Sequence, residues 1–421
     1  MADNPSITIL APYFPPRQRV GAIRPYRFAK YLSKLGWKVS VICIGDSKNT
    51  LTDYQKEEIK DIRVYSLVPP IDRTSKKPIT EESKREKKQN SFVSWFDTQF
   101  PIDTWLPFLS SKRGEIEAIL FENKTEVLFS TSDPWSSAVM ANRIASGMNI
   151  PWVADFRDPW TLCDTRFTKK GKVAQRVDER AERKIIQNAN FVTFTSSTTE
   201  EKYRQYYPEL QDKSSTIRNS FDVDIKQSES TQSELDDKLI VLFLGRFRAL
   251  STAESIIELL SYIKLNHPEL SDKIEVHSYG ELEDFDKSLA LDHAVIDKFI
   301  ARKKVTYEEV DKEIEQANVL LLSTKPERDD IIPAKLFDYL PSGKPILSMV
   351  ENPEVKAIID ETSTGLHTGH SELKKAANYL VSIYNGESKT SPNTKKIMEY
   401  SASHRAEELD QVLRKVLANV R

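Results

Sequence analysis

Residues 6–45 read SITILAPYFPPRQRVGAIRPYRFAKYLSKLGWKVSVICIG, and this stretch decides the fold. Its first residues, SITIL, form a β-branched and apolar run, and KVSVICI near its end forms a second one. Between them, Phe28, Leu32 and Leu35 recur at the spacing of one helical face, and Gly36 stands where helices commonly end. A strand, a helix and a strand within about 40 residues predict a βαβ unit and therefore a parallel sheet.

The same alternation continues to the end of the chain, with helix-like segments between strand-like runs. These further runs are 126–132, 151–156, 191–196, 239–247, 273–280, 319–324 and 344–350. The pattern predicts an α/β protein with two Rossmann-like halves. The expected parts are a first domain 1–223 with an irregular insert at about 47–120, a polar linker 224–238, a second domain 239–398, and a helix 399–421 that packs on its own domain or crosses back to the first.

Composition excludes several classes of protein. The chain has 421 residues and a formal net charge of −2, which argues against a nucleic-acid binder. Neither a run of about 18 apolar residues nor a signal peptide is recognisable, so we expect a cytoplasmic protein without a membrane span. Cys43 and Cys163 are the two cysteines, and without a CxxC pair they predict neither a disulfide nor a metal site.

Charged residues follow two strand-like runs of the first half, where parallel sheets bind ligands. In VADFRDPW, Asp155, Arg157 and Asp158 suit a polar substrate: Arg157 can bind a phosphate or a sugar hydroxyl, and Asp158 can accept a hydroxyl proton. An internal Arg–Asp pair that only closes the loop is the alternative. Asp133, in STSDPWSS, adds a carboxylate to the same end of the predicted sheet.

The first loop and the second half supply the remaining candidates. Gly21 lies in a basic loop that lacks the GxGxxG fingerprint, and it allows the backbone to approach a ligand closely. Gly245 and Arg246 follow the run LFLGRF, where an arginine can neutralise a diphosphate. Lys335 and Asp338 can bind phosphate and paired ribose hydroxyls, or they form an ordinary surface pair one helical turn apart.

Together these segments resemble the GT-B glycosyltransferases of the retaining family 4 type, over nearly the whole chain. The similar segments are APYFPPRQRVGAIRPYRFAKYLSKLGWKVSVI, PWVADFRDPWT with the FRDPW motif of a bacterial subset, TIRNSFD with Ser220 replacing a glycine, FLGRF, and PAKLFDYLPSGKPIL. The resemblance implies two Rossmann-like domains that face each other across a cleft. The family has two glutamates separated by seven residues, and Asp330 and Asp338 occupy those places here.

The resemblance also implies a role for each candidate residue. Asp338 would hold the donor ribose, Asp330 would lie near the sugar, and Arg246 with Lys335 would stabilise the departing nucleotide diphosphate. The full set is Arg157, Asp158, Arg246 and Lys335 as catalytic residues; Gly21, Gly245, Tyr279, Gly280, Asp330, Ala334, Leu336 and Asp338 on the donor; and Asp133 and Asp155 on the acceptor side. This chain departs from the family pattern with Arg157 in place of a histidine and Ser251 in place of a lysine.

The implied reaction moves a sugar from a nucleotide diphosphate sugar to an acceptor hydroxyl with retention, without a metal or other cofactor. The acceptor would be a glycan, a lipid-linked molecule or a small molecule in bacterial surface polysaccharide synthesis. A catalytically silent scaffold for glycan assembly and a sugar-nucleotide epimerase are the alternatives.

The insert is rich in aromatic residues beside a charged run. Trp95, Phe96, Phe100, Trp105 and Phe108 follow a lysine-rich segment at 84–88, so the insert can form a peripheral contact at the inner face of the plasma membrane. Alternatively, the aromatic residues cover the core and the charges form a solvated loop.

Overall fold

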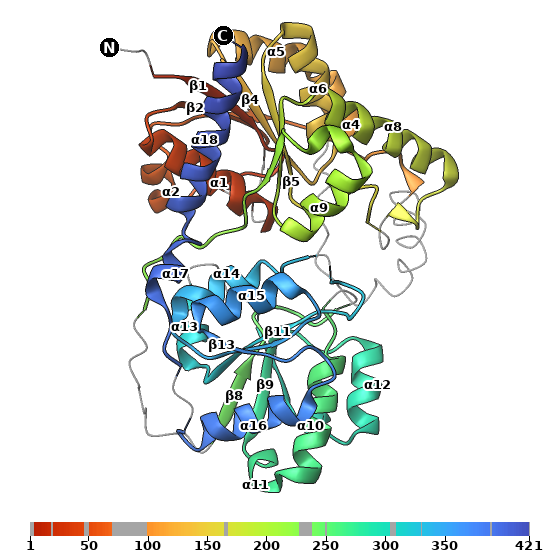
Figure 1. Cartoon of the computed structure of the whole chain (residues 1–421), viewed down its shortest axis with the longest axis vertical. Coiled ribbons are helices and arrows are strands. Elements are labelled where there is room, and N and C mark those ends of the chain that lie inside the picture. Colours follow the sequence, from red (N-terminus) through yellow and green to blue (C-terminus); the bar gives the residue numbers. More distant parts are fainter. Residues whose placement is uncertain are drawn as a thin grey trace. The chain divides into compact units, whose positions relative to one another are not determined.

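The computed structural model describes residues 4–17, 20–45, 50–69, 99–163, 167–226, 238–248, 251–303, 309–329, 331–387 and 390–420. The chain forms two compact units, Met1–Arg218 with Ala402–Arg421, and Asn219–Ser401. Each unit contains one parallel sheet between layers of helices (Figure 1), so the predicted α/β fold class is confirmed.

The first unit contains a seven-stranded sheet in the order β3-β2-β1-β4-β5-β6-β7, in which every pair is parallel. Its strands are β1 (Ser6–Leu10), β2 (Lys38–Ile44), β3 (Arg63–Leu67), β4 (Val127–Ser132), β5 (Trp152–Phe156), β6 (Phe191–Phe194) and β7 (Ser214–Thr216). The strand order reverses direction between β1 and β4, and sheets of this class bind ligands at such a point.

Helices cover both faces of this sheet because its strands are apolar on both sides. They are α1 (Val20–Lys34), α2 (Asp53–Glu58), α4 (Leu106–Ser111), α5 (Arg113–Glu122), α6 (Ser136–Met148), α8 (Lys172–Asn188), α9 (Ser197–Tyr206), the 3₁₀ turn η2 (Pro208–Leu210) and α18 (Ala402–Val420). Successive strand residues point to opposite cores: Leu10 packs with α4, α5 and α6, whereas Ile9 packs with α1 and α18.

The C-terminal helix α18 belongs to the first unit and completes one of its two cores. Leu409, Leu413 and Val416 are buried against the face of α1 that carries Phe28 and Leu32. Trp37 Nε1 also donates to Asp410 Oδ1 at 2.6 Å. Since a fully buried leucine contributes about 1.5–3 kcal/mol, α18 is a large part of what stabilises this unit.

The second unit contains a six-stranded parallel sheet in the order β10-β9-β8-β11-β12-β13. Its strands are β8 (Leu239–Leu242), β9 (Ile274–Tyr279), β10 (Phe299–Arg302), β11 (Val319–Ser323), β12 (Ile346–Met349) and β13 (Gly365–His367). Its helices are α10 (Glu254–Asn266), α11 (Pro268–Ser271), α12 (Asp284–Asp292), η3 (Ile296–Lys298), α13 (Val310–Gln316), α14 (Lys335–Tyr339), η5 (Leu340–Ser342), α15 (Pro353–Thr362), α16 (Leu373–Tyr384) and α17 (Thr394–Met398). The strand order reverses here between β8 and β11, so β8 ends at the expected ligand position.

The structure differs from the sequence-based expectations in two respects. The first unit ends at Arg218 and not at residue 223, because Phe221 is buried in the core of the second unit. The structure also adds the short strands β3, β7, β10 and β13, whose partly exposed residues lack the apolar runs of the central strands. Among the described residues, no helix has the length and apolar content needed to cross a bilayer.

Candidate functional site

Asp155, at the carboxyl end of β5, is completely buried. Arg24 donates to both of its carboxylate oxygens, from Nε at 3.0 Å and from Nη2 at 2.8 Å. Thr131 Oγ1 and Thr193 Oγ1 donate at 2.7 and 2.8 Å, so each oxygen accepts two hydrogen bonds. Burial alone would raise the pKa of Asp155, but the charge of Arg24 and these hydrogen bonds outweigh it and lower the pKa.

Arg24, the partner of Asp155, also contacts the backbone of Arg218 and the ring of Phe28. Arg24 lies on α1, and its Nη1 donates to the carbonyl oxygen of Arg218 at 2.9 Å. Its guanidinium carbon also lies 4.6 Å from the ring centroid of Phe28. Asp155 therefore positions Arg24 inside the protein, and its burial does not fit the predicted contact with an acceptor.

Arg157, the arginine of FRDPW, donates to three backbone carbonyls. Its Nε donates to Ser132 O at 2.7 Å, its Nη1 donates to Gly21 O at 2.7 Å, and its Nη2 donates to Asp133 O. The Gly21 carbonyl is available because Pro25, four residues later in α1, has no N–H to donate to it. Arg157 thus joins the start of α1 to the loop after β4, and burial lowers its pKa despite the nearby charges of Asp158 and Asp133.

The structure gives a reason for glycine at position 21 that differs from the predicted one. A Cβ at this position would lie 2.6 Å from Arg157 Nη1 and 3.0 Å from Nη2. A side chain there would therefore displace the guanidinium. In the described structure, the backbone at Gly21 lies close to Arg157. The predicted approach of this backbone to a nucleotide sugar remains a proposal.

The end of the FRDPW motif is held by a polar network that the sequence pattern does not reveal. Trp160 stacks on Trp135, with ring centroids 4.6 Å apart, and its Nε1 donates to Asp178 Oδ2 at 3.2 Å. Glu182, completely buried on α8, accepts from Tyr203 OH at 2.7 Å and from Tyr207 OH at 2.9 Å. Burial raises the pKa of Glu182, although these hydrogen bonds oppose the shift. The motif's aromatic and acidic partners thus stabilise the loop after β5.

Asp133 and Asp158 remain the candidates of the first unit for contact with a ligand. Both side chains are half-buried, and they follow the neighbouring strands β4 and β5. Their charges oppose the lowering of the Arg157 pKa, which places both near that guanidinium.

In the second unit, Gly245 and Lys335 meet beyond the end of β8. Gly245 has a φ of +149°, and a Cβ there would lie 3.0 Å from Lys335 Cε. The Lys335 ammonium lies over the Phe243 ring, 4.4 Å from its centroid. Glycine is therefore needed here because its backbone conformation and its missing side chain both admit the lysine.

Lys335 is a partly buried cation without a carboxylate at ion-pair distance among the described residues. Burial, together with the charge of Arg248, lowers the pKa of its ammonium to about 8, although the charge of Asp338 opposes the shift. Arg246 and Arg248 are exposed, and within the described ranges neither guanidinium has a hydrogen-bond acceptor. Three cations therefore stand beyond the end of β8 and can receive an anion.

Helix α14 is held to the end of β8 by its tyrosine. The backbone N–H of Leu244 donates to Tyr339 OH at 2.9 Å, and Tyr339 is completely buried. Lys335 is the first residue of this helix, and Asp338, half-buried, lies one turn later. The side chain of Leu336 is buried, and its N–H donates to Pro333 O at 3.0 Å. In this conformation Leu336 therefore has no free N–H for the predicted contact with the nucleotide sugar. Ala334 is half-buried at the helix start.

Tyr279 and Gly280 bring the end of β9 to the same place. Tyr279 N donates to Gly245 O at 2.7 Å, and a Cβ at Gly280 would lie 3.7 Å from Arg246 Cδ. Burial raises the pKa of Tyr279 to about 12, with a further contribution from the charge of Glu313. The structure therefore brings together Gly245, Arg246, Tyr279, Gly280 and Lys335, as the sequence predicts. Asp330 lies outside the described residues.

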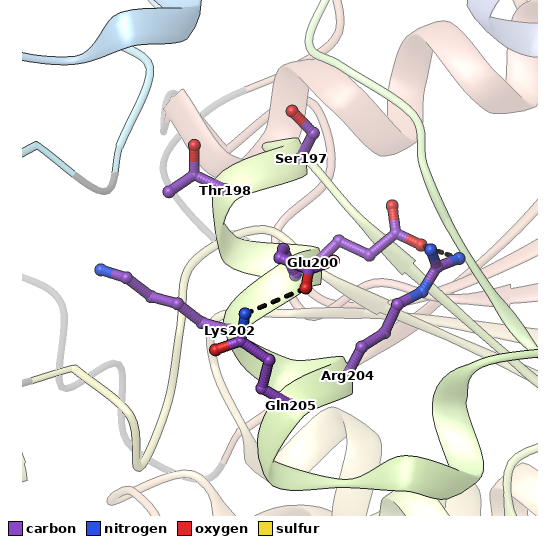
Figure 2. A pocket seen from close by; sticks show the side chains of 7 residues that line it. Ser197, Thr198, Glu200, Lys202, Arg204 and Gln205 are labelled. Carbon is purple, nitrogen blue, oxygen red and sulfur yellow. Dashed lines mark hydrogen bonds and ion pairs between the residues drawn. The ribbon is translucent and has the colours of Figure 1, made fainter.

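One surface pocket of the first unit lies along α9 (Figure 2). It is lined by Ser197, Thr198, Glu200, Glu201, Lys202, Arg204 and Gln205. Glu200 Oε1 pairs with Arg204 Nη2 at 2.6 Å and also accepts from Ser214 Oγ at 2.8 Å. These internal bonds occupy Glu200 and Arg204, and none of the predicted site residues lines the pocket.

The described part of the aromatic insert packs on the first unit. Trp105 and Phe108 are half-buried against the core that contains Leu109, and their rings meet edge to face with centroids 6.1 Å apart. These two residues cover the core. Phe100 is half-buried, and Trp95, Phe96 and the lysine-rich run lie outside the described residues.

Comparisons with known proteins support the fold. No family description matches the chain, and no curated protein matches its sequence. Among solved structures, sucrose-phosphate synthase from Thermosynechococcus elongatus aligns with a TM-score of 0.69 at 15% identity, over 99% of this chain and 100% of that one. HepE from Anabaena, in complex with UDP, aligns with a TM-score of 0.65 at 12% identity, over 98% and 100%.

A third solved structure has a different catalytic class. The putative UDP-N-acetylglucosamine 2-epimerase from Listeria monocytogenes aligns with a TM-score of 0.52 at 10% identity, over 98% of this chain and 97% of that one. Identities this low show the fold and leave the activity open. The chain therefore has the two-domain GT-B fold that its sequence predicted.

Proposed function

We propose that this chain is a glycosyltransferase that moves a sugar from a nucleotide diphosphate sugar to an acceptor hydroxyl with retention of configuration. Its proposed setting is the synthesis of a bacterial surface polysaccharide or glycoconjugate at the cytoplasmic face of the membrane. The observation that carries the proposal is the group of three cations beyond β8, Lys335, Arg246 and Arg248, for which the described residues supply no acidic partner.

These cations fit a diphosphate better than they fit a structural role. A charge that only stabilised the protein would have a carboxylate beside it, because burying an unpaired ammonium is unfavourable. Lys335 instead lies over an aromatic ring, and burial lowers its pKa to about 8. A bound diphosphate would supply the missing negative charge and restore the ordinary pKa of the lysine.

The chemistry follows from that placement. As the bond between the sugar carbon and the diphosphate oxygen breaks, negative charge grows on the leaving phosphate, where Lys335 and Arg246 stabilise it. The acceptor hydroxyl attacks the sugar from the same face, and its proton passes to the departing phosphate oxygen. Asp338 would hold the ribose hydroxyls, because a carboxylate accepts two hydrogen bonds.

In the first unit, Asp133 and Asp158 are the proposed acceptor residues. Both are half-buried and both follow strands of the sheet, in contrast to the buried Asp155. The role that we propose for Arg157 is to position the loop that carries Asp133, since its three guanidinium nitrogens donate to backbone carbonyls.

A nucleotide panel tests the donor class. UDP, GDP, ADP and dTDP are added separately, and the midpoint of thermal unfolding is measured. A ligand at about 100 times its dissociation constant stabilises the folded state by about 2.7 kcal/mol, which is a clear shift. One nucleotide should stabilise the wild type, and Asp338→Ala should abolish the effect. If no nucleotide does so, the donor site is not functional in the free protein and the scaffold alternative is favoured.

Sugar-nucleotide epimerisation is the second candidate, because one solved structure with this fold is a putative epimerase. The two reactions differ in their products. A transferase consumes the sugar nucleotide only when an acceptor is present, and NMR of its product shows the anomeric configuration of the donor. An epimerase produces an isomeric sugar nucleotide with no acceptor at all.

A further inference from the structure

Helix α8 of the first unit has one apolar face and one cationic face. Ala174, Ile185 and Ile186 are buried in the unit, where α8 lies beside α6 (Figure 1). The exposed cations of the opposite face are Lys172, Arg176, Arg180, Arg183 and Lys184, accompanied by the single exposed carboxylate Glu179. We call this set the α8 cationic face.

The cations of the α8 cationic face lie close together. At about 100° and 1.5 Å per residue, positions 172, 176, 180, 183 and 184 fall within a sector of about 120° and a length of about 18 Å. Five positive charges against one negative charge in this area differ from the chain as a whole, whose formal net charge is −2. The first unit as a whole is also basic, with 39 lysines and arginines against 30 aspartates and glutamates in residues 1–218 and 402–421, so the α8 cationic face lies on the basic unit of the chain.

The same cations have no acidic partners within the described part of the chain. Elsewhere, helical cations pair with acids one turn away: Arg113 with Glu117 at 2.7 Å, Lys112 with Glu115 at 2.7 Å, and Lys375 with Glu372 at 3.4 Å. Of the three acids on α8, Asp178 and Glu182 point inward and are completely buried, and Glu179 alone is exposed. The cationic face is thus open to an external anion.

Two exposed side chains beside the cations indicate the kind of anion. Val173, 75% exposed, falls inside the same sector of α8. Tyr206, 55% exposed on α9, packs edge to face on Tyr207, over whose ring the Arg183 guanidinium lies at 5.4 Å. A basic helical face with an apolar and an aromatic side chain is typical of helices that lie on membranes. The exposed Val173 among the cations favours a bilayer, which offers an apolar phase beside its charged headgroups, over a nucleic acid.

We propose that the α8 cationic face binds the surface of a bilayer containing anionic phospholipids. The inference extends the proposed function, because such binding would place the first unit at the surface that presents a lipid-linked acceptor. Lys and Arg side chains are attracted to the negative potential of such a surface, and salt screens this attraction within about 10 Å at 0.1 M. Binding should therefore depend on both lipid charge and ionic strength.

Vesicle flotation of the full chain tests the proposal. Vesicles of phosphatidylcholine with about 30% phosphatidylglycerol should carry the wild type at low salt, whereas pure phosphatidylcholine vesicles or high salt should not. The triple variant Lys172→Glu, Arg176→Glu, Arg180→Glu should bind anionic vesicles at least about tenfold more weakly, since three attractive charges become repulsive. The matching glutamine variant removes the charge without reversing it and should show an intermediate loss.

A matched control changes the net charge by the same amount in the second unit. Lys287→Glu, Lys312→Glu, Lys374→Glu alters three exposed helical lysines and should float like the wild type. Equal losses in both triple variants would overturn the proposal, as would an absence of wild-type flotation at low salt. Binding to RNA that depends on the α8 cations, with no flotation, would identify a nucleic acid as the partner instead.

Nucleotide stabilisation separates this inference from the proposed function. The α8 triple variant should keep the wild-type thermal shift with the nucleotide found in the panel, because none of its substitutions lies in the second unit. A protein that floats without responding to any nucleotide would refute the donor site and keep the α8 cationic face.

Discussion

In the first unit, Asp155 and Arg157 at the carboxyl end of β5 bind an arginine of α1 and the backbone. In the second unit, the cations beyond β8 have no such partners in the described ranges. Arg24 and Asp155 neutralise each other inside the protein, and Arg157 donates to three carbonyls. Lys335 lies over Phe243 with a pKa lowered by burial to about 8. The comparison separates charges that are paired within the fold from cations for which we propose a diphosphate ligand.

The largest expected effect is the loss of the buried pair in the first unit. Asp155→Ala leaves the charge of Arg24 uncompensated, and removal of one partner of a buried pair costs about 3–5 kcal/mol. Chemical denaturation should show this loss of unfolding free energy. Glu57→Ala, which removes an exposed partner of Lys60, should change it by less than about 0.5 kcal/mol. A similar small change in Asp155→Ala would contradict the structural role of the pair.

Gly21→Ala tests whether Arg157 belongs to the structural charges. The added Cβ would lie 2.6 Å from Arg157 Nη1, so the guanidinium must move, with an expected loss of about 1–3 kcal/mol. Gly114→Ala is the control, because a Cβ in that helix has no atom within 4 Å. The control should be neutral or stabilising, since alanine favours helices. If Gly21→Ala were also neutral, the Arg157 contacts would not matter for stability.

The lowered pKa of Lys335 predicts a pH dependence of nucleotide binding. In the free protein the ammonium loses its proton as the pH rises through about 8, whereas a bound diphosphate keeps it charged. Binding above that pH must therefore take up a proton, and affinity should fall about tenfold per pH unit. Calorimetric titrations between about pH 7.5 and 9.5 measure this slope. An equal slope in Lys335→Met would assign the effect to another group.

The smallest expected effect has the opposite sign to that of Asp155→Ala. Lys335→Met removes a buried charge that lacks a described partner, so it should stabilise the ligand-free second unit by about 1 kcal/mol, or about 2–4 °C in the unfolding midpoint. Lys344→Met is the matched control. Burial also lowers the pKa of Lys344, but its ammonium donates to Glu315 O at 2.8 Å, so its loss should destabilise. Destabilisation by both variants would show that Lys335 is structural.

The central strands of both sheets follow from the sequence because they are buried on both faces and read as apolar runs. The edge strands β3, β7, β10 and β13 do not, since partly exposed residues carry little of that pattern. The sequence also does not predict that α18 packs in the first unit, because this depends on which apolar faces meet. Helical periodicity shows that a face exists but not which partner covers it.

The candidate site was predictable where the chemistry rests on position after a strand, as for Gly245 and Arg246, or on spacing within a helix, as for Lys335 and Asp338. It was not predictable where the partners are backbone carbonyls, as for Arg157, because every residue has a carbonyl. Pro25 was the available signal, since a proline in a helix leaves the carbonyl of Gly21 without its donor. The full burial of Asp155 and the partial burial of Asp158 likewise depend on packing, although only two residues separate them.

The most direct test of the account compares nucleotide binding by the wild type and Lys335→Met. With the nucleotide identified by the panel, the affinities for the nucleoside diphosphate and for its nucleoside are measured by calorimetry at about pH 7, where Lys335 is protonated. Lys335→Met should lower the affinity for the nucleoside diphosphate by at least about tenfold, as expected for a lost charged hydrogen bond. The affinity for the nucleoside should not change. Equal diphosphate affinity in the two proteins would contradict the claim that Lys335 awaits a diphosphate.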